Sequence, residues 1–300
     1  MDNKAKGIIY TIVSAAAFGL TPLLCVFAYN AGANPETLVF LRNLFVVPVL
    51  FIICKVQKID LRIDAKTALM VAVVGIFGTT GTALLLYKAY EYLPVGTVTT
   101  IHFLYPVFVA IAGALFFHEK VSKVKAIVLL IATCGVFFFL ETPEGMTSSE
   151  LTIGLVLSVV SGITYAFYMV GSEQCGFGKI NSYKLTLYIS LFSGIAMFLY
   201  CIATGKLAVA NMEMTGFLYA FIIAMGTSFL AVYTLQLGIK YIGASEAAIF
   251  CMFEPVTAVI GGWLFLHESL GLMKIIGCVV ILGSVTLLTV LDKKAAEQAK

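Results

Sequence analysis

The chain alternates between long apolar stretches and short polar segments. Ten stretches are close to membrane-spanning length, and they cover residues 7–29, 37–54, 67–89, 95–117, 123–140, 151–171, 183–203, 215–239, 244–266 and 270–291. A helix rises about 1.5 Å per residue, so about 20 apolar residues cross a hydrocarbon core about 30 Å thick. Continuous runs of this length favour helices over barrel strands, which are shorter and alternate between apolar and polar residues. The pattern predicts an all-α membrane protein with ten transmembrane helices.

Composition supports a membrane environment. Hydrophobic residues make up 61% of the 300 residues and charged residues only 12%, whereas soluble domains are about 45–50% apolar. A soluble globule of this size could not bury that much apolar surface. The first stretch is too long for the core of a signal peptide and lacks a clear cleavage region, so it is predicted to remain as a membrane helix.

The basic residues are concentrated in alternate loops, which predicts an orientation. The loops rich in basic residues, together with the two termini, contain Lys4, Lys6, Lys55, Lys58, Arg62, Lys66, Lys120, Lys123, Lys125, Lys179, Lys184, Lys240, Lys293, Lys294 and Lys300. The other loops contain only Lys88, Lys206 and Lys274. Because cytoplasmic loops are enriched in Lys and Arg, both termini are predicted to lie in the cytoplasm, with the helices in the cell membrane. The net charge of +3 therefore reflects topology and gives no support for a nucleic-acid partner.

The two halves of the chain repeat one pattern. Residues 103–121, FLYPVFVAIAGALFFHEKV, align with residues 252–270, MFEPVTAVIGGWLFLHESL. The matched pairs are Tyr92 with Tyr241, Pro106 with Pro255, His118 with His267, Glu119 with Glu268 and, at a slightly different offset, Gly7 with Gly154 and Ser14 with Ser161. Each copy holds an odd number of helices, so the second must enter the membrane from the opposite side. We therefore expect two inverted-topology repeats of five helices, residues 1–145 and 146–300.

The inverted repeat is the strongest functional signal in the sequence. Such repeats allow a secondary transporter to open alternately to the two sides of the membrane around a site near the midplane. The alternative is an old duplication that is retained only for packing.

Several motifs resemble the drug/metabolite transporter superfamily and, within it, the EamA-type family of ten-helix transporters. They are SAAAFGLTPLL in the first helix, FLRN around Arg42 in the second, and FEPVTAVIGGWLFLHESL near the end. The resemblance implies a carrier of small metabolites such as amino acids, amines or nucleosides, often exported from the cell. It also implies a central cavity between the halves, lined mainly by helices 1, 3, 4, 6, 8 and 9.

The resemblance carries over only a few positions. They are the two prolines, the Glu at the end of each copy and the arginine of the second helix, namely Pro106, Pro255, Glu119, Glu268 and Arg42. Glu119 and Glu268 end their helices and are expected to organise the next turn or to close a gate. Family substrate contacts vary too widely to transfer.

Glu254 is the candidate coupling residue. It falls near the middle of the ninth helix, where a charged side chain costs about 2.5–3.5 kcal/mol on insertion scales. Pro255 removes the amide that would bond to the Cys251 carbonyl, so a polar notch is predicted near the midplane. Glu254 could carry a proton or bind a cationic group; the alternative is a hydrogen-bonded glutamate with a packing role.

Helix 4 contains the inverted counterpart of this notch. Thr99, His102 and Tyr105 recur every three residues and so share one face. Tyr105 stands where the second copy has Glu254. His102 could titrate or donate to a substrate, and a satisfied core histidine is the equal alternative.

Arg42 lies close to the outer end of the second helix. An ion pair with Glu254 would be attractive in charge, but by helical rise the two residues differ in depth by roughly 7–9 Å. The long side chain of Arg42 is therefore predicted to reach the headgroup region. Binding of a substrate carboxylate is the alternative.

Other polar and aromatic residues have weaker assignments. Four tyrosines fall in the expected cavity-lining helices and could stack on or hydrogen-bond a solute, or simply pack: Tyr87, Tyr165, Tyr168 and Tyr233. Three polar residues near cytoplasmic helix ends are predicted to be solvated: Glu173, Gln236 and Glu246. Three glycines of the third helix are expected to allow close helix approach: Gly75, Gly78 and Gly81.

An enzyme is not predicted. In the zinc motif HExxH the second histidine is replaced by Ser122 in one copy and Gly271 in the other. The cysteines lack CxxC spacing, so no metal, disulfide or cofactor is expected. The sequence predicts secondary-active transport of a small organic solute across the bilayer, coupled to protons or by exchange, by a monomer or homodimer. A passive facilitator is the main alternative.

Overall fold

A computed structural model describes residues 2–118, 122–139, 147–266 and 271–298, and all regular structure in these ranges is helical. The first half contains α1 (Asn3–Gly19), α2 (Thr21–Asn30), α3 (Pro35–Val56), α4 (Ala65–Val73), the π-helix η1 (Val74–Thr80), α5 (Gly81–Ala89), α6 (Val95–His102), α7 (Tyr105–Phe117), α8 (Lys123–Val136) and the 3-10 turn η2 (Phe137–Phe139). The second half contains α9 (Ser148–Gln174), the 3-10 turn η3 (Phe177–Lys179), α10 (Ser182–Thr204), the 3-10 turn η4 (Val209–Asn211), α11 (Met214–Ile223), the π-helix η5 (Ala224–Ala231), α12 (Val232–Cys251), α13 (Glu254–Leu266) and α14 (Leu272–Gln298).

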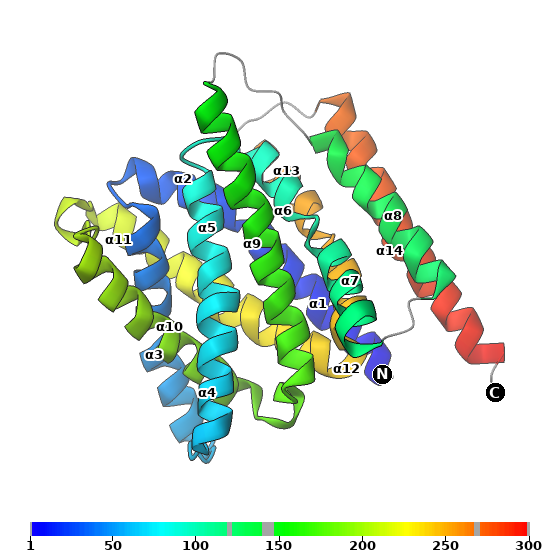
Figure 1. Ribbon diagram of the computed structural model, residues 1–300, viewed down its shortest axis with the longest axis horizontal. Helices are drawn as coiled ribbons and strands as arrows, with labels where there is room; N and C mark the ends of the chain where they lie inside the picture. Colours follow the sequence, from blue (N-terminus) through cyan, green and yellow to red (C-terminus); the bar gives the residue numbers. More distant parts are fainter. Residues whose placement is uncertain (1, 119–121, 140–146, 267–270, 299–300) are drawn as a thin grey trace.

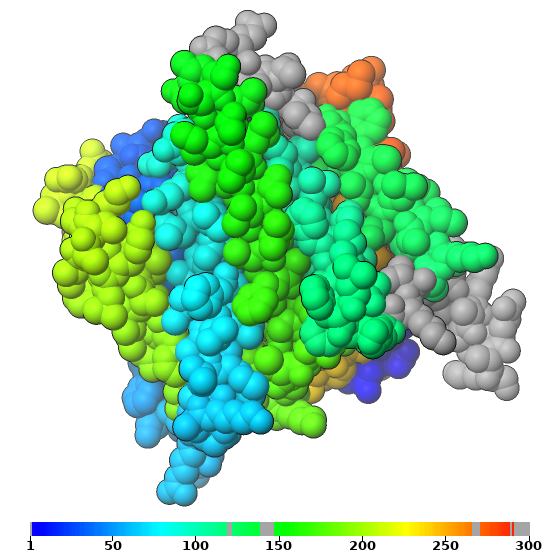
Figure 2. Space-filling model, viewed as in Figure 1, coloured from blue at the N-terminus to red at the C-terminus, as the bar shows by residue number. Residues whose placement is uncertain are grey.

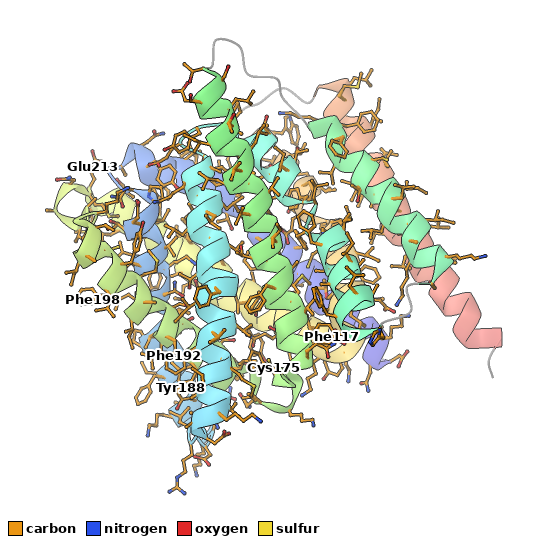
Figure 3. The ribbon with its side chains drawn as sticks, viewed as in Figure 1. Phe117, Cys175, Tyr188, Phe192, Phe198 and Glu213 are labelled. Atoms are coloured by element: carbon orange, nitrogen blue, oxygen red, sulfur yellow. The ribbon has the colours of Figure 1, made fainter. Side chains whose placement is uncertain are left out.

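Across these described ranges the helices group into ten crossings, namely α1–α2, α3, α4–α5, α6–α7, α8, α9, α10, α11 to Gly243, Ala244 to the end of α13, and α14. In the described residues, seven continuous helical segments are long and apolar enough to cross a membrane, and residues Leu272–Leu288 form a shorter apolar helix. The longest of the seven, Met214–Cys251, is divided at Gly243, whose φ of 77° and ψ of 166° are not helical. Apolar side chains cover the outer faces; Phe198 on α10, labelled in Figure 3, is 42% exposed. The prediction of an all-α, ten-helix membrane protein is confirmed.

The two halves break their helices at equivalent positions. The fourth crossing is interrupted between His102 and Tyr105, and the ninth between Cys251 and Glu254. Each break is followed by a helix with proline at its second residue, Pro106 or Pro255. Proline has no backbone N–H, and the first turn of a helix does not need one. The prolines therefore start new helices, a larger disruption than the polar notch expected at Glu254 within one continuous helix. The third and eighth crossings also match, since each contains a π-helix.

Glycines allow the first helix of each repeat to cross closely over its neighbour. A Cβ atom placed on Gly7 would lie 2.6 Å from Cγ2 of Ile242, and one on Gly154 would lie 2.4 Å from Cγ of Leu93. Leu93 and Ile242 follow the matched tyrosines of the repeat. Gly78 in η1 is equally close to α9, because its Cβ would lie 2.7 Å from Cβ of Tyr168. The glycines thus permit the close helix approach that the sequence predicted.

The core of the bundle is formed by both repeats. α1 packs along α12, and α9 packs along α5 and η1. In Figure 1, α9 crosses the front of the molecule between α5 and α7, while α8 and α14 lie side by side along one flank. The space-filling view shows the α9 and α5 surfaces in close contact across this front face (Figure 2). This arrangement leaves the interrupted helices α6, α7, α12 and α13 around the centre.

Candidate functional site

A cavity of about 60 Å³ lies between the two halves. Its walls come from α1, α2, α3, η1, α5, α6, α9, α12 and α13. Those elements belong to crossings 1, 2, 3, 4, 6, 8 and 9, so the observed lining contains every helix implied by the resemblance and adds the second. The residues in the lining whose side chains carry a polar group are Thr21, Arg42, Thr79, Thr82, Tyr87, Tyr90, Thr99, His102, Tyr165 and Glu254.

Glu254 lies at the first turn of α13 and is only 5% exposed. The hydroxyl of Tyr105 donates a hydrogen bond to Glu254 Oε1 at 3.3 Å. Tyr105 opens α7 as Glu254 opens α13, so the two residues at equivalent positions of the repeat meet at the centre of the bundle. The sequence predicted their equivalence, and the structure adds their contact.

His102 ends α6 beside this pair. Its Nδ1 lies 2.9 Å from Ser161 Oγ, and that hydroxyl donates to the Ser158 carbonyl at 2.7 Å. A serine hydroxyl has a single proton, so Ser161 accepts from His102 and Nδ1 carries a proton. The imidazole ring also packs against the rings of Tyr105 and Tyr165, with centroids 5.4 Å and 5.5 Å away. His102 therefore lines the cavity with a fixed ring orientation. Thr99, on the same face, donates its hydroxyl to the Val95 carbonyl at 2.8 Å.

Arg42 is buried, which contradicts its predicted position in the headgroup region. It is 6% exposed and lines the cavity. Its Nε donates to Ser228 Oγ at 2.8 Å and one Nη donates to Tyr87 Oη at 3.1 Å. The prediction was wrong because distance from a helix end gives depth alone, whereas the rotation of α3 against η5 and α5 directs this side chain inward.

Two phenol hydroxyls in the lining have no hydrogen-bond partner in the described part of the chain, those of Tyr90 and Tyr165. Tyr165 was a candidate; Tyr90 was missed. Its ring stacks against Tyr87 with centroids 6.2 Å apart. The spacing of three residues from Tyr87 was the available signal, since such neighbours share a helix face.

Tyr168 and Tyr233 do not line this cavity. The Tyr168 hydroxyl accepts a hydrogen bond from Gln236 Nε2 at 3.2 Å, and Tyr233 stacks on Tyr183 with centroids 4.5 Å apart. Glu119 and Glu268 lie outside the described residues.

The three polar residues predicted to be solvated are engaged in contacts instead. Gln236 is 5% exposed and accepts from Thr186 Oγ1 at 3.2 Å. Glu173 accepts from the Ala244 amide at 2.7 Å, directly after the Gly243 kink. Glu246 forms ion pairs with Lys125 at 2.5 Å and Lys4 at 3.6 Å. The prediction of solvation was wrong because adjacent helices meet at this end of the bundle and bring their polar groups together.

A second hollow, of about 360 Å³, adjoins the first at Gly19, Pro22, Thr99 and Phe103. It also touches Pro94, Val95 and Gly96, where α6 begins. The cavity therefore continues toward that end of the bundle. Within the described residues, no cluster of His, Cys, Asp or Glu could hold a metal ion.

A helical bundle built twice in opposite orientations, with a cavity between the copies, is the architecture of a membrane transporter. The sequence matches the EamA-like transporter family over residues 5–140 and 152–290. The chain therefore belongs to the EamA-like transporter family.

Relatives and solved structures agree with this assignment. An uncharacterized transporter of Bacillus subtilis, YcbK, is 28% identical over 293 residues, 92% of this chain and 90% of its own length. The uncharacterized inner membrane transporter YicL of Salmonella typhimurium is 22% identical over 305 residues, with both chains covered completely. A crystal structure with 16% sequence identity superposes with a TM-score of 0.81 over 95% of this chain and 98% of the other, which shows a shared fold.

Proposed function

We propose that this membrane transporter is a secondary-active carrier that moves a small organic solute across the cell membrane by alternating access. The observation that carries the proposal is the cavity itself, which has walls from both inverted repeats and lies at the paired helix breaks. Inverted repeats around a central site are the usual basis of alternating access. Breaks in two crossings give each half a place to bend.

The two ends of the cavity differ, which supports an outward-facing state. One end continues into the hollow beside Pro94 and Gly96. At the other end, Glu246 joins α12 to α8 and α1, and Glu173 caps the backbone after Gly243. The distribution of lysines assigns the first end to the outside and the second to the cytoplasm.

Glu254 is the proposed coupling residue. It is the single carboxyl group that lines the described cavity, and Tyr105 is its hydrogen-bond donor. A carboxyl group in this position can exchange a proton with the outer side and release it after the cavity changes sides. Proton coupling would then depend on the Glu254 carboxyl, while binding of the solute would depend on the rest of the cavity.

Transport assays in proteoliposomes, with solute present on one side of the membrane, test this function. A screen of amino acids, organic acids, amines and nucleosides would first identify a transported solute, and uptake would then be measured with and without an imposed pH difference. We expect accumulation against a gradient when a proton gradient or a counter-solute is present. Equilibration without accumulation under every condition would instead identify a passive facilitator.

The Glu254→Gln variant separates coupling from transport. It keeps the side-chain volume and an acceptor for Tyr105 but cannot carry the proton. We expect accumulation driven by a pH gradient to be lost while solute exchange continues. If both activities survived in this variant, the coupling role of Glu254 would be refuted.

A further inference from the structure

The guanidinium of Arg42 is buried in the cavity without a carboxylate partner. Its two hydrogen bonds go to neutral hydroxyls, those of Ser228 and Tyr87, and no ion pair joins it to any described residue. A guanidinium has five N–H donors, so Arg42, which lines the cavity, can donate further hydrogen bonds to a bound solute. A charge within a membrane-spanning bundle is costly unless it is paired, and such residues commonly mark a substrate pathway.

A second phenol hydroxyl, that of Tyr90, lines the same cavity next to Tyr87. The Tyr90 hydroxyl is buried and unpartnered, and its ring stacks on Tyr87, which itself holds the guanidinium. A buried hydroxyl without a partner is unfavourable, so a bound acceptor would relieve that cost. Arg42 and Tyr90 together offer a cationic fork and an O–H donor, which is the complement of an anion.

The number of charges points to a carboxylate. A phosphate monoester carries about two negative charges at neutral pH, whereas Arg42 is the one cationic side chain among the described residues that line this cavity, the next being Lys274 in the adjoining hollow. Glu254 also lines the cavity, and its carboxyl group would disfavour a dianion further. Glu254 is held by Tyr105, so it does not neutralise Arg42 by direct contact.

We infer that the solute is a small organic carboxylate, with its carboxylate group bound by Arg42 and Tyr90. This inference rests on the proposed transport function, and it narrows the solute class by excluding simple amines and nucleosides. The Tyr165 hydroxyl, also unpartnered, is left for a polar group on the remainder of the solute. The requirement for a carboxylate makes Arg42 the residue that determines specificity.

Binding to the purified full-length protein tests the inference with probes that differ by one charge. The probes are L-leucine, N-acetyl-L-leucine and L-leucinamide, with matched sets for alanine and phenylalanine. The acetylated acids keep only the carboxylate and the amides keep only the ammonium group. We expect thermal stabilisation by the acids and acetylated acids of at least one set, and none by the amides.

Variants test whether carboxylates stabilise the protein by binding to Arg42 and Tyr90. Arg42→Gln should weaken carboxylate binding about a hundred-fold, whereas Arg62→Gln, which changes the chain's other arginine in an exposed segment, should bind like the wild type. Because Arg42 also bonds Ser228 and Tyr87, its loss could impair folding. Tyr90→Phe removes a hydroxyl with no partner in the fold, so it should fold normally and bind about ten-fold more weakly.

The outcomes separate this inference from the transport function. Stabilisation by the amides equal to that by the acids, normal binding in Tyr90→Phe, or no stabilisation by any carboxylate would overturn the inference. Accumulation of a solute without an acidic group in proteoliposomes would also overturn it but would leave secondary transport standing. Carboxylate binding without transport would refute the proposed function and leave the binding site intact.

Discussion

The ion pairs of Glu246 give a prediction about how the inner end of the cavity stays closed. Glu246 Oε1 lies 2.5 Å from Lys125 Nζ on α8, and Oε2 lies 3.6 Å from Lys4 Nζ on α1. Ala244, two residues earlier, donates its amide to Glu173 at the end of α9. The segment from Ala244 to Cys251 is therefore held by three neighbouring helices. The Glu246→Gln substitution keeps the side-chain volume and removes the charge.

The exposed fractions of the paired side chains determine how much free energy each ion pair is expected to contribute. The side chains of Glu246 and Lys125 are 14% and 27% exposed, while Lys4 is 38% exposed. Exposed pairs contribute about 0–1 kcal/mol, so the Lys4 contact is given no weight and the Lys125 contact is worth about 1 kcal/mol. A loss of about 1 kcal/mol from the closed state raises the population of the open state about five-fold.

Hydrogen exchange of the purified protein, measured by mass spectrometry, reports how often the inner end of the cavity opens. In Glu246→Gln, the amides of residues 244–251 should exchange about five-fold faster, while those of α3 should be unchanged. Glu213→Gln is the matched control, because Glu213, labelled in Figure 3, is exposed just before α11 and its carboxylate accepts a hydrogen bond from Thr215. Equal acceleration in α3 would show general destabilisation. Exchange like that of the control would refute the reasoning.

Two further predictions follow from packing and charge. Gly78→Ala should lower the free energy of unfolding by about 1–3 kcal/mol, because the added Cβ would lie 2.7 Å from Cβ of Tyr168. Gly283→Ala is the control, since its added Cβ would meet nothing within 4 Å. Thermal unfolding in detergent compares the two variants, and equal stability would contradict the close packing at Gly78. The carboxylate of Glu36, 3.0 Å from Lys206 Nζ, raises the pKa of Lys206 above its ordinary 10.5. This contact is complete below pH 10 and is lost as the pH rises through the raised pKa. Lys206→Gln should therefore melt below the wild type at pH 8, with a difference that shrinks in strong alkali; a constant difference would show that the contact contributes nothing.

The sequence predicted the scaffold because its determinants are local. Apolar length fixes a membrane helix, and proline disturbs the helix at a known position, so a local disruption at Pro106 and Pro255 was predicted although a full break was not. The repeat allowed Tyr105 to be paired with Glu254 without any structure. The π-helices were not predicted, because widening the backbone at Val74–Thr80 depends on how α9 and α10 pack against it.

The cavity was predicted less well because it depends on helix rotation. The position of Arg42 along its helix was predicted correctly, but the direction of its side chain was not. A run that is apolar on nearly every side does not show which face of the helix is turned inward. Glu246 was expected in water for the same reason, although it lies between Lys4 and Lys125. Tyr90 was overlooked because it follows the last residue of the predicted third helix. Each miss concerns a contact between segments that are distant in sequence.

Differences between the repeats are where directionality must arise. If the two inverted halves were identical, the inward-open and outward-open states would be mirror arrangements of equal free energy, and neither would be preferred. The structure departs from that symmetry at Glu246, whose equivalent in the first half is Thr97, and at Glu254, whose equivalent is Tyr105. The first difference adds ion pairs that close one end alone. The second places a carboxyl group on one side of the central contact, so that protonation changes the interactions of one half and not of the other.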